Sequence, residues 1–181
     1  MSDWASILSE HGATVWRTVY RLLNDHADAL DCYQETFLAA WRLAERQPVL
    51  AWRALLVRLA TRRALDRLRQ RLRTRARFTA LGAVPEPATD AGCPPRQAEA
   101  AELLDRVRQA LARLPQKQAE VFWLSCLEGQ SHEQISQVLN VPTGEVRVLL
   151  HRARVHLARV LEPDRSCGGK DHERELEAPG P

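Results

Sequence analysis

The residues of this chain best suited to chemistry are basic ones at helical spacing near its C-terminal end. Positions 147–154 read RVLLHRAR, which places Arg147, His151, Arg152 and Arg154 on the outward side of a predicted helix. Guanidinium groups can fork onto the guanine edge in the major groove or onto phosphates. The pattern favours a DNA-binding helix. An ordinary helical hairpin with a solvated basic face stays open as the alternative.

A second basic group lies in the middle of the chain. Residues 51–77 contain ten arginines and one acid, Asp66, whereas the whole chain carries a net charge of only +3. A strongly basic segment in a nearly neutral chain is typical of a polyanion-binding surface. The arginine excess is equally well explained by a GC-rich genome.

No residue set indicates catalysis. The His132-Glu133 pair lacks the second histidine of a zinc protease motif because position 136 is Ser. The four cysteines (32, 93, 126 and 167) form no CxxC pair, so we expect free thiols and no metal site. The sequence therefore predicts no cofactor and no enzymatic activity.

The elements that must position these residues are all helices. Apolar residues recur at helical spacing over residues 3–24, 27–46 and from about 49 to 77, and nothing alternates with the period of a strand. Gly and Pro crowd into residues 79–97, which is linker chemistry. We expect an all-α fold with two small helical domains, 1–77 and 98–162. A flexible Pro/Gly-rich linker (78–97) joins them, and a disordered tail (163–181) follows.

The second domain contains the signals of a helix-turn-helix. Ser131 and Gln134 form a capping box that begins one helix, and Asn140 suits the left-handed residue of a tight turn. Thr143 is a credible N-cap for the next helix. Two short helices joined by such a turn match the motif.

No apolar run reaches the length of a membrane span, and the first residues lack a secretion signal. The sequence therefore predicts a cytoplasmic protein without membrane insertion of its own.

Two separated stretches read DALDCYQETFLAAWR (28–42) and LPQKQAEVFWLSCLEGQSHEQISQVLNVPTGEVRVLLHRAR (114–154). Together they resemble the extracytoplasmic-function (ECF) group of bacterial sigma factors. The first is similar to the polymerase-clamp segment of that family, and the second is similar to its minus-35 domain. The resemblance implies a protein that binds core RNA polymerase and directs it to promoters.

The resemblance also implies site residues. For polymerase binding these are Asp31, Gln34, Glu35, Phe37 and Trp41, although core packing is the other reading of Phe37 and Trp41. For minus-10 DNA they are Trp52, Arg62, Arg63, Arg67 and Arg69. For minus-35 DNA they are Arg147, Val148, His151, Arg152 and Arg154.

The sequence departs from the family pattern at several positions, among them Arg62 in place of a usual Asn and Glu145 in place of a usual Thr. The segment LAERQPVLA (43–51), which corresponds to the minus-10 pocket, is a few residues shorter than usual. In the recognition helix Val148 and Leu149 replace polar residues. Apolar side chains there can read thymine methyl groups, and weaker DNA binding or a buried face against a partner are the alternatives.

Members of the ECF group are commonly controlled by an anti-sigma factor, which is the further partner implied here. The alternatives are a stand-alone helix-turn-helix regulator and a helical adaptor that binds only protein.

Overall fold

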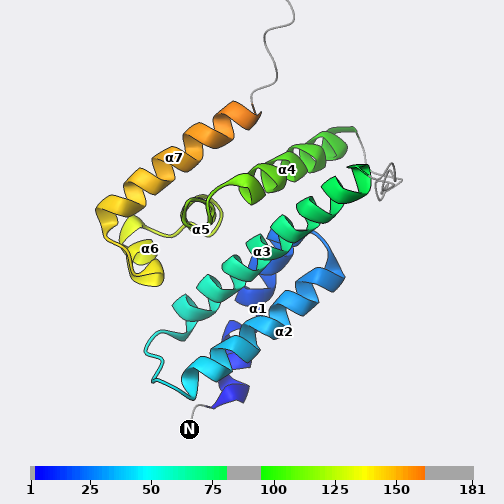
Figure 1. The fold of residues 1–181 in the computed structure, drawn as a ribbon. Helices are drawn as coiled ribbons and strands as arrows, with labels where there is room; N and C mark the ends of the chain where they lie inside the picture. Colours follow the sequence, from blue (N-terminus) through cyan, green and yellow to red (C-terminus); the bar gives the residue numbers. More distant parts are fainter. Residues whose placement is uncertain (1–2, 81–94, 162–181) are drawn as a thin grey trace, which may run out of the picture.

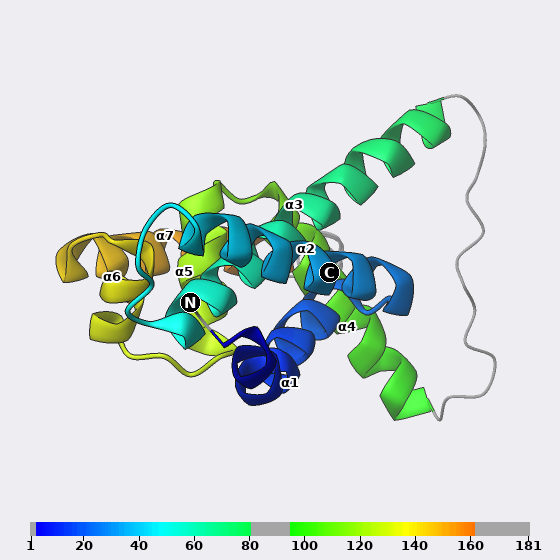
Figure 2. The ribbon, with the colours of Figure 1, turned by 90° about the horizontal axis from the view of Figure 1, so that it is seen from below.

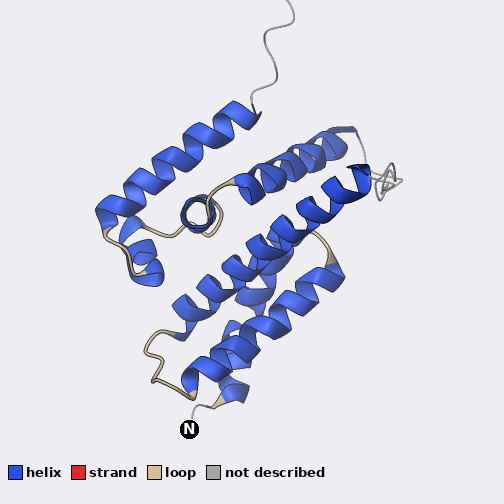
Figure 3. Cartoon of the chain, in the orientation of Figure 1, coloured by secondary structure: helices blue, strands red, loops and turns tan. Residues whose placement is uncertain are grey.

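The computed structural model describes residues 3–80 and 95–161, and over these ranges the chain is built from seven α-helices without a strand (Figures 1 and 3). The helices are α1 (Trp4–Leu23), α2 (His26–Ala44), α3 (Trp52–Ala80), α4 (Pro95–Arg113), α5 (Gln116–Cys126), α6 (His132–Leu139) and α7 (Thr143–Leu161). The all-α prediction is confirmed. None of these helices is both long and apolar enough to cross a membrane.

The first helix begins and ends where the sequence predicts. The Asp3 carboxylate accepts a hydrogen bond from the Ala5 amide at 3.1 Å, which satisfies a backbone donor of the first turn. Asn24 ends α1 in the left-handed conformation, with φ of 47°. Asp25 caps α2 directly afterwards by accepting from the Asp28 amide at 2.9 Å. The two helices are therefore joined by a connection of only two residues.

The helix-turn-helix is formed by α6 and α7. Ser131 and Gln134 make both hydrogen bonds of the capping box, and Asn140 is left-handed with φ of 53°, as predicted. The Ser136 hydroxyl donates to the Val141 carbonyl at 2.6 Å, which ties the turn back onto α6.

Helices α1, α2 and α3 form a bundle around a continuous apolar core. Its centre consists of residues without solvent exposure, chiefly Val15, Val19, Leu22, Leu56 and Leu65. The same core continues into α4 and α5 through Ala110, Leu111, Leu114, Ala119 and Trp123. Helix α3 therefore packs against α1 and α2 of its own predicted domain and also against α4 and α5 of the other (Figures 1 and 2).

Two predicted segments lie mainly outside the described residues. Helix α3 continues to Ala80 and α4 begins at Pro95, so helix extends into both ends of the predicted linker. The rest of that linker, 81–94, and the tail, 163–181, are not described.

Arginine side chains bind the ends of several helices. Backbone carbonyls in the last turn of a helix have no partner within it. Arg71 donates to the Leu23 carbonyl at 2.9 Å and Arg108 to the Arg21 carbonyl at 3.2 Å, both in the last turn of α1. Arg106 donates to the Leu161 carbonyl of α7 at 3.2 Å. Part of the arginine content therefore has a structural use.

Candidate nucleic-acid and protein interfaces

Helix α7 presents all five residues predicted for minus-35 DNA to solvent. Arg147, Val148, His151, Arg152 and Arg154 are exposed, and Val148 has an exposed fraction of 48%. The opposite side of the helix is buried through Val146, Leu150, Ala153 and Leu157. The structure therefore brings the predicted set together on one face, backed by a packed stripe that fixes its orientation.

The start of α7 is held against α5 as well as α6. Lys117 of α5 forms an ion pair with Glu145 in the first turn of α7 at 3.1 Å. A carboxylate there also interacts favourably with the helix dipole. The N-terminal half of α7 is thus supported on two sides, as a helix that enters a groove requires.

The arginines predicted for minus-10 DNA lie along α3, and three of them already have partners. Arg63 binds Glu35 at 2.8 Å, and Arg67 binds Asp31 at 3.3 Å. Both carboxylates belong to the predicted polymerase-binding set on α2. The two predicted sites are therefore adjacent, and their opposite charges are paired with each other.

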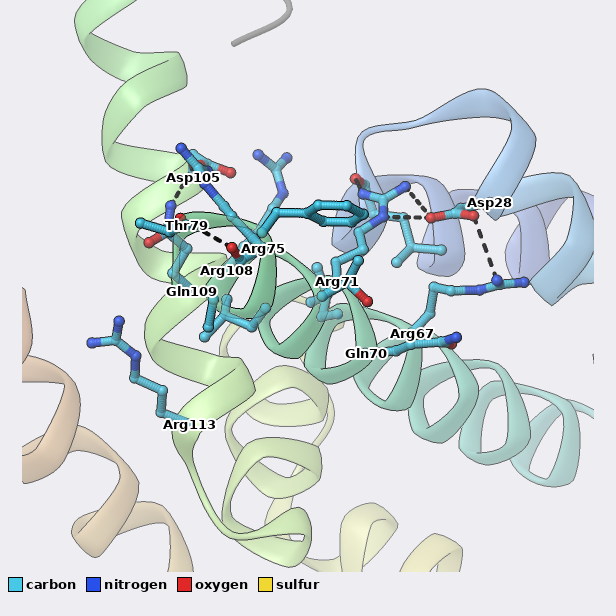
Figure 4. A pocket seen from close by; sticks show the side chains of 16 residues that line it. Asp28, Arg67, Gln70, Arg71, Arg75, Thr79, Asp105, Arg108, Gln109 and Arg113 are labelled. Carbon is cyan, nitrogen blue, oxygen red and sulfur yellow. Dashed lines mark hydrogen bonds and ion pairs between the residues drawn. The ribbon is translucent and has the colours of Figure 1, made fainter. Parts of the chain in front are cut away.

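Asp28 extends this row of ion pairs although the sequence interpretation did not select it. It lies between Arg67, at 3.7 Å, and Arg71, with which it forms a close ion pair (Figure 4). Its side chain is 24% exposed, less than that of Asp31 or Glu35. Asp28, Asp31 and Glu35 are three and four residues apart, so they share one face of α2, and this spacing could have identified Asp28 from the sequence.

Arg69 and Arg62 differ from their neighbours. Arg69 pairs with Asp66 at 3.1 Å on its own helix and also reaches the end of α4. Arg62 is exposed and forms no ion pair with any described residue. Along α3, Arg62 is thus the predicted DNA contact with the least engaged guanidinium.

The outer face of α2 carries most, but not all, of the predicted polymerase-binding residues. Asp31, Gln34 and Glu35 are exposed, and Trp41 has an exposed fraction of 46%. Phe37 is only 8% exposed and packs against Tyr33, with ring centroids 5.0 Å apart. Phe37 therefore supports this surface from within the core.

The short loop between α2 and α3 contains the most exposed apolar side chain among the described residues. Leu50 is 97% exposed, which costs free energy in water and gave no signal in the sequence. Trp52, at the start of α3, stacks edge-on against Trp4 of α1 with ring centroids 5.2 Å apart. Trp52 is thus fixed in the bundle, and Leu50 is the free apolar group of the loop.

Glu120 of α5 is a carboxylate buried beside α3, with an exposed fraction of 7%. Burial raises its pKa, and a hydrogen bond from Gln116 at 2.6 Å together with the nearby Arg62 and Arg58 partly opposes that rise. The sequence gave no sign of this contact because Glu120 reads as a surface residue of a helix.

The described residues contain no cluster of side chains suited to a metal ion. Of the cysteines they include, Cys32 is buried and Cys126 is exposed, and both are free thiols. Burial raises the pKa of Cys32 despite its contact with Arg67.

Comparison with known protein families defines the class of this chain. Residues 7–74 match the model of sigma-70 region 2, and residues 104–157 match that of sigma-70 region 4. The first range covers most of the α1–α3 bundle, and the second runs from α4 into α7, including α6, the turn and all but the last four residues of α7. The chain thus has the two regions of a sigma-70-type factor.

Individual relatives narrow the class. The chain is 33% identical over 156 residues to the ECF RNA polymerase sigma factor SigL of Mycobacterium tuberculosis, covering 82% of each chain. It is 32% identical over 166 residues to the ECF RNA polymerase sigma factor SigE of Mycolicibacterium smegmatis, covering 89% of this chain and 62% of that one. The chain belongs to the ECF sigma factors.

Solved structures share the fold at lower identity. RpoE of Bartonella quintana, in complex with the anti-sigma factor NepR, aligns with a TM-score of 0.53 and 21% identity over 91% of this chain and 100% of that one. CnrH, in complex with the cytosolic domain of CnrY, aligns with a TM-score of 0.55 and 24% identity over 88% of both chains.

Proposed function

We propose that this chain binds core RNA polymerase through α2 and directs it to promoters by contacting minus-35 DNA with α7 and minus-10 DNA with α3. The observation that carries the proposal is the face of α7, where five predicted DNA contacts lie together over a buried stripe. Arginine near the start of such a helix can read guanine, and Val148 can contact a thymine methyl group.

The polymerase contact is proposed for the exposed part of α2. Asp31, Gln34 and Glu35 offer polar and acidic groups beside the half-exposed Trp41. An aromatic anchor next to carboxylates suits a basic helical partner. Leu38, 48% exposed on the same helix, enlarges the apolar part of this surface.

The minus-10 contact is proposed for Arg62, Arg63, Arg67 and Arg69, with Trp52 and Leu50 at the loop that precedes them. Basic side chains hold the phosphates of an opened strand, and an exposed apolar side chain packs against an unstacked base. We further propose that an anti-sigma factor controls the chain, that it acts in the cytoplasm, and that it initiates transcription without enzymatic activity of its own.

The test is co-purification of the tagged full-length chain with core RNA polymerase. We expect a stoichiometric complex for the wild type and its loss for Gln34→Ala combined with Trp41→Ala, because both side chains lie on the surface. Arg17→Ala with Arg46→Ala, on other parts of the bundle, is the matched control. Circular dichroism confirms that each variant is folded. A folded wild-type chain that binds duplex DNA but no polymerase would instead be a stand-alone regulator.

A further inference from the structure

A groove runs between the C-terminal half of α3 and the neighbouring α4 (Figure 4). Its volume is about 1260 Å³, which is above the roughly 300–1,000 Å³ that is typical of small-molecule sites. One wall consists of α3 residues between Arg67 and Thr79, and the facing wall consists of α4 residues between Asp105 and Arg113. The groove therefore has room for an organic molecule with several functional groups.

The groove carries more positive charge than its own carboxylates neutralise. Five arginines and two aspartates line it, so three positive charges remain. The arginines are Arg67, Arg71, Arg75, Arg108 and Arg113, and the aspartates are Asp28 and Asp105. The first three arginines are four residues apart, so they form a row along one face of α3. Positive groups that line a concave site focus their field on it, and the groove therefore attracts anions.

The positive charge at one end of the groove is already paired. Asp28 forms a close ion pair with Arg71 and lies 3.7 Å from Arg67 (Figure 4). Arg71 also donates to the Leu23 carbonyl at 2.9 Å. Arg67 and Arg71 thus have partners in the folded chain, and an anion at this end would compete with Asp28 for them.

The remaining arginines of the groove are less engaged. Arg75 and Arg113 are exposed, and neither forms an ion pair with a residue in the ranges 3–80 and 95–161. Arg108 is partly buried, and burial lowers its pKa. The carboxylate of Asp105 opposes this fall in pKa, whereas the like charge of Arg71 adds to it. An anion beside Arg108 would therefore stabilise a guanidinium whose charge is poorly compensated.

The groove also offers an aromatic ring and polar side chains. Phe78 lines it near the end of α3 and has an exposed fraction of 50%. Thr74 is four residues from Phe78 on the same face of α3, and Gln70 lies a further turn back. Aromatic side chains stack on nucleobases, and amides and hydroxyls form hydrogen bonds with base edges. The lining therefore combines groups that suit phosphates with groups that suit a base.

We propose that this groove binds a nucleoside polyphosphate. Arg75 and Arg108 hold the phosphates, because a guanidinium donates two parallel hydrogen bonds to a phosphate group. Phe78 stacks on the base, and Gln70 contacts its edge. Apart from Arg67 at one end, the site lies outside the surfaces proposed for polymerase and DNA, so binding requires neither of them.

A polyphosphate suits the groove better than a nucleic-acid strand does. A strand carries one negative charge per nucleotide, spread along its length. A nucleoside polyphosphate instead concentrates several negative charges on one short group beside a single base. The uncompensated arginines belong to both walls of one groove and so match a concentrated charge.

Isothermal titration calorimetry of the full-length chain without polymerase tests the site. The probes are ATP, GTP and inorganic tripolyphosphate, which share a chain of phosphates but not a base. We expect the wild type to bind each nucleotide at one site per chain and tripolyphosphate more weakly, because the base adds stacking to the phosphate contacts. Binding of no probe, or binding of tripolyphosphate as tightly as the nucleotides, would overturn the proposal.

Arg75→Ala removes a phosphate contact without removing a contact of the fold. We expect all three probes to bind about tenfold more weakly, since hydrogen bonds between charged groups are lost. Arg77→Ala is the matched control, because it removes the same charge from an exposed position of α3 that does not line the groove. It is expected to change binding less than twofold. Equal losses in the two variants would show a general attraction of anions and no site.

Phe78→Ala distinguishes a nucleotide from other polyanions. We expect ATP and GTP to bind at least about fivefold more weakly, whereas binding of tripolyphosphate stays unchanged. Unchanged binding of the nucleotides would refute the stacking on Phe78. Circular dichroism confirms that each variant keeps its helix content.

A single-stranded oligonucleotide is the competing ligand. If it binds more tightly than ATP and loses the same affinity in both groove variants, the groove takes a nucleic-acid strand and the proposal is wrong. Failure of the wild type to co-purify with polymerase would refute the proposed function and leave the titrations with nucleotides unaffected.

Discussion

Replacement of Arg147 by alanine is expected to weaken promoter recognition in a sequence-dependent way. Arg147 is exposed near the start of α7, above the buried Val146 and Leu150, so its guanidinium is carried into the groove by a fixed backbone. Loss of one bidentate guanine contact costs about 1–3 kcal/mol, which is a factor of about five to 150 in binding. Truncation to alanine leaves the helix intact, because alanine has the highest helix propensity.

The effect expected for Arg147→Ala differs from that of removing a phosphate contact, which we assign to Arg154 further along α7. Arg154→Ala is expected to weaken binding to all sequences alike and to lower the salt dependence by about 0.9 per lost phosphate contact. Arg159→Ala is the matched control, since it removes the same charge from an exposed site about 18 Å from Arg147 and about 7.5 Å from Arg154 along the helix.

The assay is run-off transcription by the reconstituted holoenzyme on a promoter recovered by selection with that holoenzyme. Each minus-35 base pair is substituted in turn, and transcription is measured at several salt concentrations. Arg147→Ala is expected to lose discrimination at one or two base pairs only. A uniform loss over all templates, or no loss at all, would show that Arg147 does not read a base and that α7 is oriented differently.

Three further outcomes follow from the burial or exposure of single residues. Phe37→Ala is expected to lower the free energy of unfolding by about 3–5 kcal/mol in urea titrations, because Phe37 is buried. Trp41→Ala is expected to leave stability nearly unchanged and to weaken polymerase binding at least tenfold. Equal effects of the two substitutions on stability would contradict the assignment of Phe37 to the core. The pKa of Glu120 is raised by burial, so the stability of the folded chain falls as pH rises from about 4.5 through that raised value. Glu120→Gln is expected to flatten this fall and to raise the melting temperature at pH 7. An unaltered pH dependence of stability would exclude Glu120 as its source. Leu50→Asp is expected to reduce strand opening, measured by permanganate reactivity of unpaired thymines, without changing polymerase binding; wild-type reactivity would mean that Leu50 contacts no base.

Local chemistry was sufficient to predict the helices and the helix-turn-helix. Asp3, Asn24, Ser131 and Asn140 act on backbone groups within a few residues, so their effect is written in the sequence itself. The face of α7 is equally local, because its buried and exposed residues follow from helical spacing.

The partners of the arginines depended on the tertiary structure. The family resemblance assigned Arg63, Arg67 and Arg69 to minus-10 DNA, but the folded chain pairs the first two with carboxylates of α2 and places the third on the end of α4. A guanidinium binds phosphate, carboxylate and carbonyl groups by the same donors, so residue type alone does not select among them.

The relation between the two regions was also decided by tertiary packing. By itself the sequence determined two helical regions, the turn between α6 and α7, and the side of α7 that faces inward, whereas Leu38 and Trp41 of α2 read as core residues and are about half exposed. It did not determine that Val57 would be buried by α5 and α6, or that Glu120 would lie beside the arginines of α3. Helical periodicity identifies a buried side but not the helix that buries it, because apolar burial is non-directional and depends only on which surfaces meet.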